Sequence, residues 1–163
     1  EIAIPTVEFN LIFQLTHIYA HLMNEGIGLR QLVDYYYVLI SDDLLLIRDR
    51  VQKELKELGL WKFAGAIMYI MQEVFGMPAS RLIVPPNEKY GKFVLNEVLE
   101  AGNFGKHDER NRFGRSKLGH NLQRVYRDMR LVRYFPAEAL SEPIFRIWHF
   151  FWRLRWDFTY RLR

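Results

Sequence analysis

The chain has 163 residues, of which half are hydrophobic and 15% aromatic, and it has no cysteine. This length suits one domain with a substantial core, and the apolar content argues against disorder. The lack of cysteine excludes disulfides and thiolate-metal sites, which fits a reducing cytoplasm. The sequence shows no signal-peptide pattern and no apolar stretch long enough for a transmembrane segment. We therefore expect a globular, cytoplasmic protein.

Charge is distributed unevenly along the chain. Residues 1–102 include nine basic and 13 acidic residues, a net charge of −4, whereas residues 103–163 include 14 and six, a net charge of +8. The basic part could attract phosphates or an anionic surface, or it could be an ordinary solvated surface.

Hydrophobic periodicity predicts helices along nearly the whole chain. The first begins at Pro5 or Thr6 and ends at Gly26 and Gly28, because glycine readily takes the left-handed conformation after a helix. A second helix covers residues 29–39. The apolar stripe of the first helix consists of Phe9, Ile12, Phe13, Leu15, Ile18, Tyr19 and Leu22.

The third and fourth predicted helices differ in character. Ser41 is the predicted N-cap of the third, which ends at Gly59, and Arg50 and Glu54 can form an ion pair across one of its turns. Residues 60–76 are apolar on most sides and predict a central helix. Within it, "GA" at residues 65–66 would let a neighbouring helix approach closely.

The remaining segments follow a proline-rich connector in which residues 81–84 could form a short extended piece. We predict a fifth helix at residues 88–101, a long irregular loop near 102–115, a sixth helix at 116–134 that Pro136 closes, and a last helix capped at Ser141. The prediction is an all-α protein, a single bundle of about six or seven helices that forms one domain over residues 1–163.

Two histidines four residues apart, His17 and His21, project from one face of the first helix. Zinc motifs with this spacing also need a glutamate beside the first histidine and a third ligand. Because Ile18 takes the place of that glutamate, we predict no metal site. We expect these histidines, with Arg30 and Asp34, to form one polar surface that faces a cleft or a buried ion pair.

Arg30 and Asp34 allow two interpretations of the second helix. They could pair as a surface salt bridge one turn apart. Alternatively, Arg30 lies in a cleft and offers its planar guanidinium group to a phosphate or carboxylate.

The loop "GNFGKHDERNR" is a second candidate site. Its glycines and basic side chains, with Asn103, Lys106 and His107, could cradle a phosphate. The alternative is a structural loop anchored by Phe104 and Phe113.

The C-terminal stretch "FRIWHFFWRLRWDFTYRLR" interleaves aromatic residues with arginines. Such a helix can lie in a membrane interface or bind RNA. Because its aromatic residues spread around the helix, we expect it instead to pack in the core, with arginines that stack on rings or extend to water.

The stretch "FNLIFQLTHIYAHLMNEGIGLRQLVDYYYVL" resembles the helical half of uncharacterised nucleotidyltransferase-like proteins of Bacteroidetes, bacterial proteins related to the polymerase-beta-type superfamily. The segments "EAGNFGKHDER" and "RYFPAEALSEPIFRIW" resemble later parts of that family, so the resemblance covers nearly the whole chain.

The resemblance implies how such a protein would work. In that superfamily a Gly-Ser turn and an Asp-x-Asp pair hold two divalent metals such as Mg²⁺, which orient a nucleoside triphosphate. This chain has neither motif, nor a nucleophile elbow. We therefore expect a catalytic part upstream of Glu1, a chain that is not catalytic alone, and no cofactor in the chain itself. The implied contacts to nucleotide or acceptor are His17, His21, Arg30 and Asp34, and more weakly Asn103, Lys106 and His107.

A rival interpretation is a non-enzymatic helical adaptor. Its basic C-terminal part would bind nucleic acid or an anionic membrane surface, with a steep dependence on salt for nucleic acid.

Overall fold

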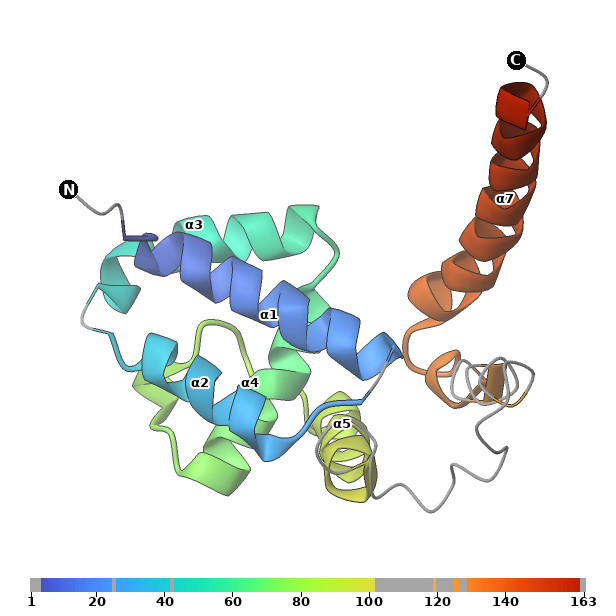
Figure 1. Ribbon diagram of the computed structural model, residues 1–163. Helices are drawn as coiled ribbons and strands as arrows, with labels where there is room; N and C mark the ends of the chain where they lie inside the picture. Colours follow the sequence, from blue (N-terminus) through green and yellow to red (C-terminus); the bar gives the residue numbers. More distant parts are fainter. Residues whose placement is uncertain are drawn as a thin grey trace. The chain divides into compact units, whose positions relative to one another are not determined.

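The computed structural model describes residues 4–24, 26–41, 43–101, 119, 125–126 and 129–161. Every regular element in these ranges is a helix, which confirms the all-α prediction (Figure 1). The chain divides into two compact units, residues 1–111 and 112–163, and each is described by itself. One domain over the whole chain stays a prediction.

The first unit holds most of the described helices. Two of them, α2 and α5, have the bounds that the sequence predicts. The third helix, α3, begins three residues after the predicted cap Ser41, and Asp43 precedes it without a capping hydrogen bond from its side chain. The elements are α1 (Val7–Asn24), α2 (Leu29–Leu39), α3 (Leu44–Glu57), α4 (Trp61–Phe75), the 3-10 helix η1 (Ala79–Arg81) and α5 (Glu88–Ala101).

Helix α4 is the centre of this unit, as its sequence predicts. It contacts α2, α3 and α5, and the rings of Tyr19 on α1 and Phe63 lie 4.5 Å apart. Residues 63–68 are buried on every side of the helix, and the neighbouring segments surround this stretch (Figure 1). The buried residues of α4 are Phe63, Ala64, Gly65, Ala66, Ile67, Met68, Ile70 and Met71.

Two glycines let the backbone come close around α4. The N–H of Asn87 donates to the carbonyl of Gly65 at 2.9 Å, and a Cβ on Gly65 would lie 3.1 Å from that of Asn87. The close neighbour of Gly65 is therefore the connector before α5, and the predicted helix-to-helix approach at this residue is wrong. That approach occurs instead at Gly91 of α5, which lies against Tyr69 of α4.

The connector after α4 contains η1 but no strand, so the extended piece predicted at residues 81–84 does not pair with another segment in the described residues. Leu82 to Val84 are buried. The side-chain amide of Gln52 on α3 donates to the carbonyl of Ile83 at 2.6 Å, and Arg81 donates to the carbonyl of Ser41 at 2.8 Å. These bonds fasten the connector to the start and middle of α3.

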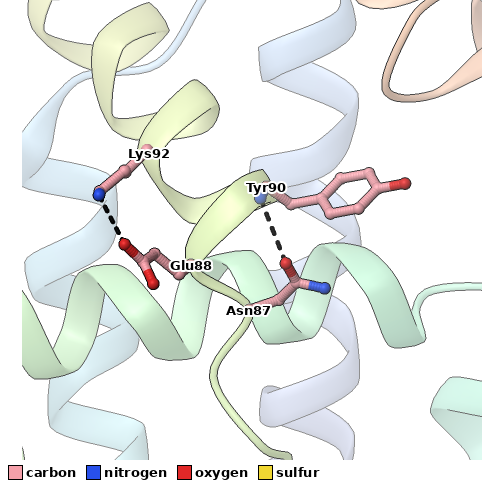
Figure 2. Close-up of polar contacts among 4 residues, drawn as sticks. All are labelled: Asn87, Glu88, Tyr90 and Lys92. Carbon is pink, nitrogen blue, oxygen red and sulfur yellow. Dashed lines mark hydrogen bonds and ion pairs between the residues drawn. The ribbon is translucent and has the colours of Figure 1, made fainter.

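The start of α5 is capped locally (Figure 2). The side-chain oxygen of Asn87 accepts a hydrogen bond from the N–H of Tyr90 at 3.3 Å, the contact that an N-cap residue makes. One turn on, Lys92 donates to Glu88 at 2.6 Å, and this hydrogen bond together with the lysine charge lowers the pKa of the Glu88 carboxyl.

The apolar stripe of α1 is only partly buried. The core takes Leu11, Leu15, Ile18 and Leu22, whereas Phe9 and Phe13 are 55% and 54% exposed. Two of the predicted stripe residues therefore lie on the surface, because the buried face of α1 is centred on the row of side chains from Leu11 to Leu22.

An ion pair between helices replaces one predicted within a helix. Arg50 of α3 lies 3.4 Å from the carboxylate of Glu8 on α1, and in the described residues it makes no ion pair with Glu54. Helices α1 and α3 run side by side at this contact (Figure 1).

The second unit contains α7 (Pro136–Arg161). Proline at the first helical position is favourable, because its missing N–H would have no partner there. The prediction that the last helix starts near Ser141 is wrong, because α7 begins at Pro136. The helical residues that precede this proline end at Leu131, before it, as predicted. Of the predicted sixth helix, residues 119, 125–126 and 129–131 are helical. The predicted loop near 102–115 lies outside the described residues.

The described apolar side chains of α7 are exposed, contrary to the prediction that this helix packs in the core. No helix in the described ranges is both long and apolar enough to cross a membrane. The exposed side chains are Leu140, Ile144, Phe145, Ile147, Trp148, Phe150, Phe151 and Trp152.

The close contact of α5 with α4 predicts that substitution of Gly91 destabilises the protein. A Cβ at residue 91 would lie 2.5 Å from Cβ and Cγ of Tyr69, so Gly91→Ala should lower the free energy of unfolding by about 2 kcal/mol. Helix propensity alone would raise it by about 1 kcal/mol. Urea denaturation measures the difference, with the exposed Asn96→Ala on the same helix as control. A stabilised Gly91→Ala variant would contradict the close packing.

Candidate functional site

The turn between α1 and α2 is built by backbone geometry. The N–H of Gly26 donates to the carbonyl of His21 at 2.7 Å, and Gly26 has a φ of 90°, which favours glycine. Ile27 is completely buried, and the N–H of Gly28 donates to the side-chain oxygen of Gln31 at 3.1 Å. The end of α1 and the start of α2 are therefore fixed to each other.

The structure brings the two predicted histidines together. Their Nε2 atoms lie 3.0 Å apart, and the rings meet edge to face with centroids 4.3 Å apart. His17 also stacks on Phe13, which stacks on Phe9, at centroid distances of 6.0 and 5.5 Å. Four rings at four-residue spacing thus form a ladder along α1, exposed at Phe9, Phe13 and His17 and half-buried at His21.

Arg30 and Asp34 lie on the face of α2 opposite its buried residues, and both are exposed. In the described residues no hydrogen bond or ion pair joins their side chains to each other or to the histidines. The surface salt bridge is therefore not formed, and the guanidinium group of Arg30 is open to solvent. A role for either residue in binding stays a prediction.

The other predicted residues, Asn103, Lys106 and His107, lie outside the described residues. Within the described ranges, no three His, Cys, Asp or Glu side chains gather closely enough to hold a metal ion.

A groove between α1 and α3 contains none of the seven predicted site residues. Its volume is about 410 Å³, and it is lined by Thr6, Glu8, Phe9, Ile12, Phe13, Thr16 and Glu54. The sequence signal for this groove was the recurrence of aromatic rings at residues 9, 13, 17 and 21. These rings form a row along the helix beside the row of leucines and isoleucine that fills the core. Helical periodicity alone places these phenylalanines in the apolar stripe instead.

The comparison with protein families gives a match over the first part of the chain. Residues 1–76 match the model of a family described as uncharacterised nucleotidyltransferase. These residues contain α1 to α4 in full, and therefore the histidine pair, Arg30 and the groove. No curated protein and no solved structure gives a significant match. The wider resemblance through "EAGNFGKHDER" and "RYFPAEALSEPIFRIW" stays a prediction.

The short distance within the histidine pair predicts a tautomer. For one Nε2–H to donate to the other Nε2, the accepting ring must carry its proton on Nδ1. At alkaline pH, long-range proton–nitrogen NMR spectra should therefore show an Nδ1–H tautomer at either His17 or His21. In His21→Ala, the remaining ring should return to the tautomer mixture of an exposed histidine. Nε2 protons on both neutral rings would contradict the hydrogen bond.

Proposed function

We propose that this chain forms the helical, nucleotide-contacting part of a nucleotidyltransferase and does not transfer a nucleotide by itself. The observation that carries the proposal is the family match over residues 1–76, which contain the first four helices of the first unit. The acceptor is unassigned by this match.

The turn between α1 and α2 is where we propose that the phosphates bind. The first-turn N–H groups of a helix have no acceptors within the helix, and they attract anions. Helix α2 has no acidic residue in its first turn, and Arg30 in that turn is exposed. His21 is the basic residue in the last turn of α1, and its carbonyl accepts a hydrogen bond from Gly26 in the turn that follows.

Divalent metal chemistry would come from elsewhere in this proposal. A metal such as Mg²⁺ supplies charge that neutralises a triphosphate during transfer. The described residues bring together no set of three potential metal ligands. Their proposed task is to orient the nucleotide, with the carboxylates for the metal provided outside them.

Substitution of Arg30 tests the nucleotide role. A charged hydrogen bond to phosphate contributes about 1.5 to 3 kcal/mol, so Arg30→Ala should weaken binding of ATP, or of whichever nucleoside triphosphate binds best, about tenfold or more. Because Arg30 is exposed and makes no ion pair in the described residues, the free energy of unfolding should change little.

Titration calorimetry with each nucleoside triphosphate measures the affinity, and Lys62→Ala is the matched control, because Lys62 is exposed on α4. Wild-type affinity in Arg30→Ala, together with a large loss of stability, would assign Arg30 to structure and contradict the proposal.

The exposed aromatic residues of α7 favour a second candidate, binding of an anionic membrane surface. Phe145 and Trp148 lie with ring centroids 5.7 Å apart, and Trp148 and Trp152 6.4 Å apart, on a helix that also carries exposed Arg153 and Arg155. Aromatic side chains beside arginines are typical of helices in a membrane interface.

Vesicles test this candidate directly. The protein should sediment with vesicles that contain phosphatidylserine, less so as salt rises, and its tryptophan fluorescence should shift to shorter wavelength. Trp148→Ser should weaken binding, and Trp61→Phe on α4 is the control. Equal sedimentation with vesicles of neutral lipid only, or none with either, would contradict it.

A further inference from the structure

The groove between α1 and α3 is mainly apolar, with an aromatic wall. Phe9 and Phe13 stack with their planes within 10° of parallel and keep more than half of their surface exposed. A volume of about 410 Å³ lies within the roughly 300 to 1,000 Å³ of small-molecule sites. Exposed, stacked phenylalanine rings beside such a hollow offer a flat apolar surface to a ligand.

The polar atoms that line the groove are hydrogen-bond acceptors for the most part. The hydroxyl of Thr16 donates to the carbonyl of Ile12 at 2.8 Å, so its oxygen is left to accept. The carboxylate of Glu54 makes no ion pair or hydrogen bond in the described part of the chain, because Arg50 turns to Glu8 instead. The groove therefore contains one carboxylate without a cation and a second shared with an arginine.

We propose that this groove binds a small organic cation, an amine attached to an aromatic or apolar body. The body would lie against Phe9 and Phe13, and the amine would reach Glu54. A cation beside a phenylalanine ring is attracted by the negative face of the ring as well as by the carboxylate. The two contributions act on the same ligand, which gives the groove its selectivity.

An anionic ligand does not fit this arrangement. Its charge would meet the carboxylate of Glu54, and Arg50 is already paired with Glu8. The nucleotide phosphates are proposed to bind at the other end of α1. The two sites lie too far apart for a transfer between their ligands, so we treat the cation as a ligand of its own, and its binding does not rest on the proposed function.

Three indole compounds of nearly equal shape distinguish the contribution of the ligand's charge to binding from that of its aromatic ring. Tryptamine is a cation at neutral pH, tryptophol is neutral and indoleacetate is an anion. In titrations of the ¹⁵N-labelled chain without nucleotide, the amide signals of Phe9, Phe13 and Thr16 should shift. The order of affinity should be tryptamine, then tryptophol, then indoleacetate.

Charge substitutions at the groove should act in opposite directions. Glu54→Gln should weaken tryptamine binding about threefold and leave tryptophol unchanged, whereas Arg50→Gln should strengthen tryptamine binding because it releases Glu8. Phe13→Ala should weaken all three compounds. These side chains are exposed, so the variants should fold, and the exposed Glu73→Gln on α4 is the control.

Two results would overturn the proposal: indoleacetate binding as tightly as tryptamine, or Glu54→Gln behaving like Glu73→Gln. No shift with any compound would overturn it as well. Arg30→Ala should leave tryptamine affinity unchanged, so a failure of the nucleotide proposal would be seen separately from a failure of this one.

Discussion

The first unit depends on the burial of α4. Its residues 63–68 are all buried, so no side of this stretch of the helix faces water. Helices α2, α3 and α5 and the connector after α4 therefore have to surround it, and glycine at residues 65 and 91 lets two of these segments come close. At Tyr35 of α2 the packing of the core outweighs the need of a polar group for a hydrogen-bond partner. The hydroxyl of Tyr35 is buried without a hydrogen-bond partner in the described residues, and burial raises the pKa of this hydroxyl.

Helix α1 covers this core from outside, and its apolar surface is wider than the core requires. Leu11, Leu15 and Ile18 fill the contact, and the next line of side chains, from Phe9 to His21, is left along the border with solvent. The buried face of α3, with Ile47, Val51 and Leu55, holds α3 beside this line, and Arg50 and Glu8 form an ion pair across the border. The groove therefore exists because the core covers only part of the apolar surface of α1. The uncovered part, with Phe9 and Phe13, lies beside the charged helix α3.

Local signals in the sequence predicted the fold better than the site. The bounds of α2 and α5, the turn at Gly26 and the central position of α4 all depend on residues close together in the chain. The exposure of Phe9 and the partner of Arg50 depend on residues some 40 positions away, because Glu8 and Arg50 meet only once α1 and α3 are packed. Periodicity shows that a helix has an apolar stripe, but it does not show which side chains of a wide stripe become buried in the core. The same limit explains the early start of α7 at Pro136, since proline both ends and begins helices.

Charge separates the two proposed binding regions of α1. Phe9 and His21 are 12 residues apart, so a rise of 1.5 Å per residue places them about 18 Å apart along the helix. The screening length at physiological salt is about 8 Å, and an exposed cation near Glu54 would hardly affect an anion near Arg30. One helix can therefore carry a site for a cation near its start and a site for phosphates near its end. If both are occupied, α1 itself sets the spacing between the two ligands, because the core side of the helix is fixed by the packing of Leu11, Leu15 and Ile18.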